Sequence, residues 1–72
     1  MAETVDARGL SCPQPVMDTL NMIAKVGSGT IEVLLDSEAS EENVTRAASS
    51  QGWNVTSVTD EGDHHKLTIT KA

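Results

Sequence analysis

The sequence predicts a two-layer α+β sandwich with the element order β-α-β-α-β-β, in which two helices cover one face of a mixed four-stranded sheet. In two segments apolar residues recur at helical spacing, and in others they alternate with polar residues. A strand, a helix and a second strand almost always form a right-handed parallel unit, so both helices are expected on the same face. Because 72 residues have room for one domain, we expect a single domain spanning residues 1–72.

The first half of the chain predicts a strand, a helix and a second strand. Residues 4–7 alternate like a short strand, which Gly9 ends. From residue 13 to 25 the apolar positions follow helical spacing, and the inner face should carry Val16, Leu20 and Ile23, flanked by Met17 and Ala24. Residues 30–36 alternate again and predict a strand with one fully apolar face.

The second half predicts a helix followed by a β-hairpin. Ser40 has a side chain suited to an N-cap, and Gly52 ends the helix that follows it. The inner face of this helix should carry Val44, Ala47, Ala48 and Gln51. Trp53 then supplies the bulk that the alanines lack. Segments 53–59 and 66–71 are rich in Val, Thr and Ile, and residues 60–63 form the loop between these two strands.

Composition excludes several classes of partner and location. Lys and Arg total 5 against 11 Asp and Glu, so the formal net charge of -6 repels phosphate backbones and anionic lipid headgroups. A single aromatic residue also argues against RNA binding, because it offers little for bases to stack on. There is no signal-peptide pattern and no apolar stretch near the length of about 18 residues that spans a membrane. We therefore expect a cytoplasmic monomer that binds neither nucleic acid nor membrane.

The only thiol of the chain stands at the predicted start of the first helix. With one cysteine, an internal disulfide and a four-thiolate zinc site are both excluded. Pro13 suits the first helical position and pushes the residue before it out of the helical region, which makes Cys12 the N-cap. Pro15 has no N–H, so the Gln14 N–H is the conventional donor left for the sulfur. At this positive end of the helix dipole the pKa of the thiol should fall below about 8.5, and further if Arg8 turns inward.

The same residues allow other interpretations. Cys12 can also be a small buried hydrophobe, with prolines that merely start a helix. Adjacent residues in a strand face opposite sides, so His64 and His65 cannot share a metal ion unless the loop persists through them, and they fit an exposed hairpin flank. Carboxylates early in a helix favour its dipole, which explains a solvated acidic face at Glu38, Glu41 and Glu42. We expect no metal site and no cofactor.

The stretch Asp6-Ala7-Arg8-Gly9-Leu10-Ser11-Cys12-Pro13-Gln14-Pro15 resembles the signature of the TusA-like sulfur carriers, also called SirA-like or YedF-like. The similarity covers essentially the whole chain. It implies that Cys12 accepts sulfane sulfur as a persulfide from a cysteine desulfurase or a rhodanese-like donor. It also implies that an acceptor protein with a reactive cysteine receives this sulfur. The residues expected to support the loop and the helix start are Asp6, Arg8, Gly9, Pro13, Gln14 and Pro15.

Two questions stay open in the sequence. Residues 41–52 are similar to a branch of the family linked to selenium metabolism, so sulfur and selenium are both candidate cargoes. A function of another class also fits the same residues, namely a non-catalytic module that docks a regulatory partner through residues 8–15. In that case no sulfur would move.

Overall fold

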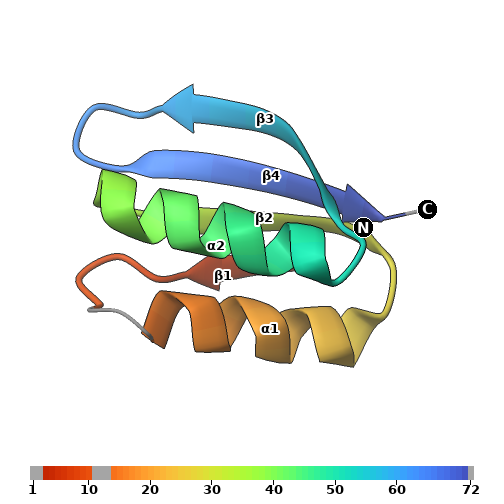
Figure 1. Cartoon of the computed structure of the whole chain (residues 1–72). Coiled ribbons are helices and arrows are strands. Elements are labelled where there is room, and N and C mark those ends of the chain that lie inside the picture. Colours follow the sequence, from red (N-terminus) through yellow and green to blue (C-terminus); the bar gives the residue numbers. More distant parts are fainter. Residues whose placement is uncertain (1–2, 11–13, 72) are drawn as a thin grey trace.

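The computed structural model describes residues 3–10 and 14–71, which form two layers (Figure 1). Within these residues the elements follow the predicted order: β1 (Glu3–Asp6), α1 (Gln14–Val26), β2 (Gly29–Leu35), α2 (Glu38–Ser50), β3 (Asn54–Asp60) and β4 (His65–Lys71). The sheet has the order β1-β2-β4-β3, with β1 parallel to β2 and the other neighbours antiparallel. The predicted mixed sheet covered by two helices is confirmed.

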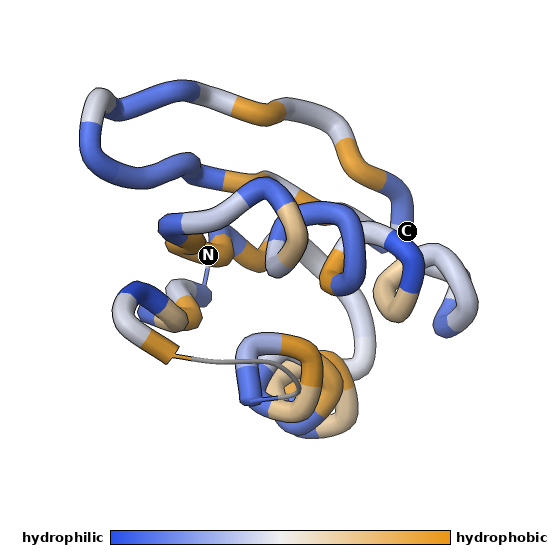
Figure 2. The backbone as a smooth tube through the Cα atoms, turned by 60° about the vertical axis from the view of Figure 1, so that its left-hand side comes forward, coloured by the Kyte–Doolittle hydropathy of each residue, from blue (hydrophilic) through white to orange (hydrophobic). Residues whose placement is uncertain are grey.

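The core lies between the helices and the central strands. Ile31, Val33 and Leu35 alternate along β2 and are fully buried, and Ile31 and Val33 lie opposite Ile69 and Leu67 of β4. This alternation of hydrophobic and hydrophilic positions is visible along the strands in Figure 2. Trp53, just before β3, is 1% exposed, as expected for the residue that fills space beside the small side chains of α2.

The buried face of α1 is rotated from the predicted one. Its buried residues are Pro15, Thr19 and Ile23, whereas Val16 and Leu20 are only partly buried and Met17 and Ala24 are exposed. The predicted inner face did not include Thr19, which is a polar residue. In the structure its hydroxyl donates a hydrogen bond of 2.8 Å to the carbonyl oxygen of Pro15, which satisfies the group inside the protein. Thr19 can therefore pack like an apolar residue.

The second helix begins earlier than predicted. Ser37, not Ser40, is the N-cap, because its backbone is extended and its hydroxyl accepts a hydrogen bond of 3.1 Å from the Ser40 N–H. Ser40 is a buried residue inside the first turn. Val44 and Ala48 form the buried stripe, but Gln51 is exposed because it follows the last helical residue and no longer continues the helical spacing. Gly52 ends the helix region with a φ of 83°, a conformation that favours glycine.

Neither helix has the length and apolar content needed to cross a membrane, as judged on the described residues. The two helices pack against each other and against the same face of the sheet (Figure 1). The opposite face of the sheet carries polar side chains such as Glu32, Lys66 and Thr68, with Lys66 Nζ 3.8 Å from a Glu32 carboxylate oxygen. Antiparallel sheets commonly leave one such face in water.

Candidate functional site

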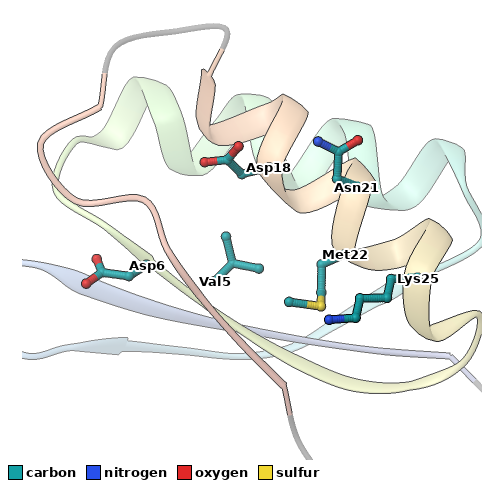
Figure 3. A pocket seen from close by; sticks show the side chains of 6 residues that line it. All are labelled: Val5, Asp6, Asp18, Asn21, Met22 and Lys25. Carbon is teal, nitrogen blue, oxygen red and sulfur yellow. The ribbon is translucent and has the colours of Figure 1, made fainter.

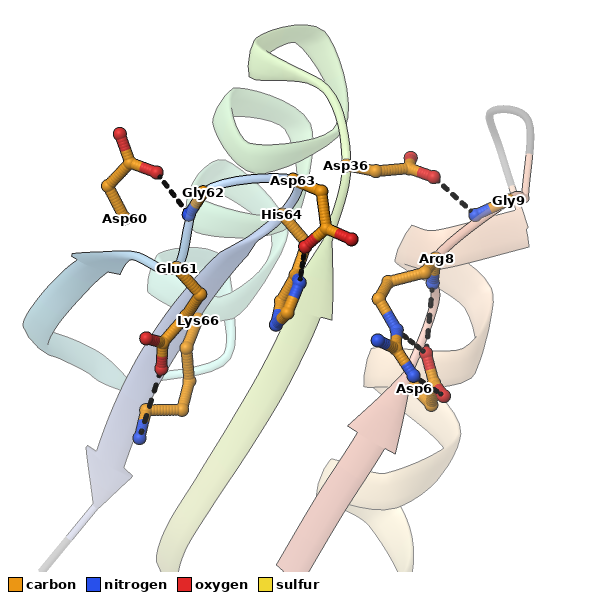
Figure 4. Close-up of polar contacts among 10 residues, drawn as sticks. All are labelled: Asp6, Arg8, Gly9, Asp36, Asp60, Glu61, Gly62, Asp63, His64 and Lys66. Atoms are coloured by element: carbon orange, nitrogen blue, oxygen red, sulfur yellow. Dashed lines mark hydrogen bonds and ion pairs between the residues drawn. The ribbon is translucent and has the colours of Figure 1, made fainter.

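Three chain segments meet at one end of the sheet. β1 and β2 are parallel, so their carboxyl ends lie together, and the loop between β3 and β4 reaches the same end (Figure 4). Open α/β sheets usually place their ligands at this end of the strands. Here a surface hollow of about 490 Å³ is lined by Asp6, Arg8, Gly9, Asp36 and Asp63.

The loop after β1 is fixed to the end of β2. The Ala7 N–H donates a hydrogen bond of 2.9 Å to the Leu34 carbonyl, which extends the pairing of the two strands by one residue. The Gly9 N–H then donates a hydrogen bond of 2.5 Å to an oxygen of the Asp36 carboxylate. Gly9 has a φ of 75°, in the left-handed region, so a side chain at this position would strain the turn. These contacts set the direction in which the chain leaves β1.

Arg8 turns back to Asp6 across the same turn. Its Nε and one terminal nitrogen each lie 2.9 Å from a carboxylate oxygen of Asp6, and its backbone N–H also donates to that carboxylate. The hydrogen bonds from the Arg8 side chain and backbone lower the pKa of Asp6 to about 2. Asp6 in turn raises the pKa of Arg8. Because this guanidinium is engaged by Asp6, its charge is already balanced by a carboxylate.

The two histidines have separate partners, although His64 lies in the loop before β4 and only His65 is in the strand. His64 Nδ1 lies 2.6 Å from Asp63, and the hydrogen bond with His64 lowers the pKa of Asp63. His65 Nδ1 lies 3.4 Å from Glu41 of α2. The prediction of an exposed hairpin flank was wrong, since the two histidine side chains are 19% and 27% exposed. Glu41 is likewise partly buried, because His65 lies against it from the sheet.

After residues 11–13, the start of α1 is fixed by Pro15, the second residue of the helix. Pro15 is buried, and its carbonyl accepts the Thr19 hydroxyl. The side chain of Gln14 donates a hydrogen bond of 2.7 Å to Asp18, one turn later. The first turn of α1 contains no acidic residue, whereas that of α2 contains Glu38 and Glu41. The positive end of the α1 dipole is therefore not neutralised by a carboxylate of its own first turn.

Of the predicted site residues, Asp6, Arg8 and Gly9 share the hollow, and Gln14 and Pro15 begin α1. Cys12 and Pro13 lie outside the described residues, so the predicted N-cap position of the thiol stays a prediction. Sequence reasoning missed Asp36 and Asp63 as neighbours of this loop. The parallel pairing of the first two strands could have indicated Asp36, because it directly follows the second one.

A second hollow, of about 290 Å³, lies between β1 and α1 (Figure 3). Val5 and Met22 give it an apolar part, and charged or polar groups surround them, namely Asp6, Asp18, Asn21 and Lys25. Asp6 thus borders both hollows. No three His, Cys, Asp or Glu side chains of residues 3–10 and 14–71 are grouped so that they could hold a metal ion.

Comparison with known proteins shows which family this chain is similar to. The family model described as "Sulfurtransferase TusA" matches residues 3–71. The chain is 34% identical over 70 residues to the "Putative sulfur carrier protein YrkI" of Bacillus subtilis, covering 96% of this chain and 93% of the relative. It is 31% identical over 68 residues to a "Putative sulfur carrier protein" of Archaeoglobus fulgidus, covering 93% of each.

A solved structure agrees with this assignment. The crystal structure of a SirA-like protein from Desulfitobacterium hafniense superposes with a TM-score of 0.88 at 28% identity. The match covers 100% of this chain and 99% of the other. The similarity of fold therefore extends along the full length of both chains.

Proposed function

Because the chain belongs to the TusA sulfurtransferase family, we propose that it is a sulfur carrier that holds sulfane sulfur as a persulfide on Cys12. The observation that carries the proposal is the position of this residue. Cys12 is the only cysteine of the chain, and it lies between the anchored Gly9 and the first turn of α1. As one domain, residues 1–72 then act as a shuttle between two other proteins.

The proposed chemistry moves one sulfur atom without net oxidation. The Cys12 thiolate attacks the outer sulfur of a persulfide on a cysteine desulfurase or a rhodanese-like donor. A new S–S bond forms on Cys12 while the donor's S–S bond breaks, and the donor cysteine leaves as a thiolate. An acceptor cysteine then attacks the terminal sulfur and releases Cys12 as a thiolate. Reduced thiols are required throughout, which suits the cytoplasm.

The surroundings favour this role in two ways. A helix N-terminus stabilises a thiolate through its free N–H groups and its dipole, and the first turn of α1 has no acidic residue to oppose that effect. The Asp36 contact at Gly9 and the buried Pro15 fix the chain before and after residues 11–13. A nucleophile between two fixed points of the chain loses less conformational entropy when it meets its partner. The proposal does not depend on Arg8, because its guanidinium is bound to Asp6.

Intact-mass measurement tests the proposal. The protein is incubated with a cysteine desulfurase and cysteine, and we expect the mass to rise by one sulfur atom. The Cys12→Ser variant should show no adduct, and circular dichroism checks that it folds. Addition of a reducing thiol should remove the sulfur from the loaded protein. If the unsubstituted protein takes up no sulfur, the alternative of a docking module without sulfur transfer is favoured.

The cargo is a second question for the same experiment. The resemblance of residues 41–52 to the selenium-linked branch supports selenium as an additional cargo. A persulfide and a selenosulfide differ only in the outer atom, so the same thiolate can accept either. Loading with a selenocysteine lyase and selenocysteine should add the mass of one selenium atom to the protein but not to Cys12→Ser. Sulfur uptake without selenium uptake would restrict the carrier to sulfur.

A further inference from the structure

The two edges of the sheet are unequal. β1 forms one edge and has 4 residues, with a charged residue at each end, Glu3 and Asp6. β3 forms the other edge and has 7 residues, of which Asp60 alone is charged and none is proline. Proteins usually protect an edge strand by making it short or by placing charges and prolines on it. β3 is neither short nor rich in charges or prolines, and it is exposed along nearly its whole length. The protection it does carry is a bulge between Val55 and Ser57.

A bulge in β3 turns two valines toward a groove. Val55 lies opposite Ile69 and Val58 lies opposite Leu67, both buried residues of β4, although the two valines are three positions apart. The register shift between Val55 and Ser57 accounts for this placement. Figure 2 shows the two hydrophobic stretches of β3 separated by a polar one. Val58 is 53% exposed, so this side of the strand presents apolar surface to solvent.

α2 forms the other wall of the groove. The groove has a volume of about 470 Å³ and is lined by Glu41, Glu42, Thr45, Arg46, Val55 and Val58. Arg46 lies 3.3 Å from Glu42, one turn apart on the helix, and both side chains are about three-quarters exposed. The groove therefore combines an apolar floor with two acidic groups and one basic group on the same wall. Of the two acidic groups, Glu41 already faces His65, which leaves Glu42 beside Arg46.

We propose that this edge and groove bind a second copy of the chain, with the two β3 strands antiparallel about a two-fold axis near Ser57. This pairing sets Asp60 opposite Asn54, so no like charges meet along the strands. The two α2 helices then face each other in opposite directions across the valines. Glu42 of one copy comes opposite Arg46 of the other, and the reverse pair forms by symmetry. The groove is thus complementary to itself.

The dimer revises the expectation of a monomer and leaves the sulfur site untouched. A two-fold axis across β3 reverses the strand direction, so the two ends that carry Gly9 and Asp36 lie at opposite ends of the dimer. Both remain accessible to donor and acceptor proteins. Because each copy carries a formal charge of -6, the dimer should be weak and populated only at high protein concentration.

Sedimentation velocity over a concentration series up to about 1 mM, where weak contacts are populated, tests the proposal. We expect the unsubstituted protein to shift reversibly from monomer to dimer. Val58→Lys should lower the association constant by about tenfold or more, since it places a charge on the edge strand that pairs with the second copy. Met17→Lys is the matched control, because Met17 is also an exposed apolar residue but lies on α1, away from the groove. Circular dichroism checks that both variants fold.

Charge exchange at the helix wall tests the symmetry. Glu42→Arg and Arg46→Glu each place like charges opposite one another in a homodimer, so each variant alone should be monomeric. An equimolar mixture of the two should dimerise, because the variant with two basic groups then faces the variant with two acidic groups. Sulfur loading on Cys12 should be unchanged in Val58→Lys, Glu42→Arg and Arg46→Glu, so the dimer and the carrier role fail independently.

Three results would overturn the proposed dimer. One is a protein that stays monomeric at every concentration, as it would if the groove bound a different protein. Another is a dimer that Val58→Lys and Met17→Lys weaken equally. The third is a mixture of the charge variants that associates no better than either variant alone.

Discussion

The Asp36 carboxylate accepts a hydrogen bond of 2.5 Å from the Gly9 N–H, a residue 27 positions earlier in the chain. Asp36 directly follows β2, and Gly9 lies in the turn after β1, so this contact joins the ends of the two parallel strands. It also fixes the chain two residues before the segment that contains Cys12. This contact and its neighbours lead to expectations about the site loop, the stability of the protein in acid, the thiol and the starts of the two helices.

Removing the Asp36 carboxylate should loosen the loop. In Asp36→Ala the Gly9 amide loses a charged acceptor, so its hydrogen exchange should become about tenfold faster. Sulfur loading of Cys12 should slow in the same variant, because the nucleophile is less well positioned. Asp60→Ala is the matched control, since Asp60 also accepts a hydrogen bond from a glycine, Gly62, at 2.9 Å. Equal effects in the two variants would contradict a specific role for Asp36.

The Asp6–Arg8 pair should stabilise the protein above pH 4 and fail in acid. The folded-state pKa of Asp6 is about 2, below its ordinary value of 3.8, so the unfolded chain takes up the proton first as the pH falls. This contribution is complete above the ordinary value and is lost as the pH approaches the folded value. In Asp6→Asn, urea denaturation should therefore show a smaller loss of stability between about pH 4 and pH 2. Identical pH profiles for the two proteins would exclude the pair as a source of acid sensitivity.

The Cys12 thiol should ionise more readily than a free cysteine. The rate of alkylation by iodoacetamide, followed against pH by mass spectrometry, should reach half its maximum below about pH 8.5. The physical reason is the positive end of α1, whose first turn contains no acidic residue. Gln14→Glu adds a carboxylate to that turn and should raise the midpoint. An ordinary midpoint in the unsubstituted protein would argue against activation by the helix.

The buried Thr19 hydroxyl should contribute to the stability of the helix start. Thr19→Val keeps the shape of the side chain but loses the hydrogen bond of 2.8 Å to the Pro15 carbonyl. We expect a loss of about 1 kcal/mol in the free energy of unfolding, measured by urea denaturation with circular dichroism. Thr19→Ser keeps the hydroxyl, so its change in the free energy of unfolding measures the contribution of the methyl group alone. If Thr19→Val were as stable as the parent, the hydrogen bond would add nothing to its packing.

Ser37 should stabilise α2 as its cap. In Ser37→Ala the Ser40 N–H loses its acceptor, and we expect a loss of about 1 kcal/mol in the free energy of unfolding. Ser49→Ala is the control, since Ser49 is an exposed serine near the other end of the same helix. A loss of the same size in both variants would show that the effect does not come from the cap.

The sequence predicted the order and type of the elements because periodicity is a local property. The alternation of Ile31, Val33 and Leu35 and the helical spacing around Val44 and Ala48 were sufficient. Three details failed for physical reasons. Thr19 is buried through a local hydrogen bond, the helix cap lies at Ser37 instead of Ser40, and Gln51 falls beyond the helix. The bulge in β3 was not predictable, since it depends on pairing with β4.

The candidate site was predictable only in part. The stretch from Asp6 to Pro15 identified the loop, and the structure places Asp6, Arg8 and Gly9 together. Asp36 joins them because it follows the strand parallel to β1, a position that the predicted pairing could have indicated. Asp63 joins them through a contact between distant parts of the chain, which a single sequence does not reveal. Arg8 was expected to add to the activation of the thiol only if it turned inward, and its guanidinium instead binds Asp6, two residues away.

Trp53 is 1% exposed, and the chain contains no tyrosine and no phenylalanine. Ultraviolet fluorescence of this protein therefore comes from one indole, which lies beside α2 at the start of β3. Its emission should move to longer wavelength when the core opens, because water then reaches the ring. The start of β3 lies at the same end of the sheet as the start of β2, whereas Gly9 contacts Asp36 after the end of β2. Sulfur loading should therefore leave this signal unchanged, so that fluorescence separates unfolding from loading.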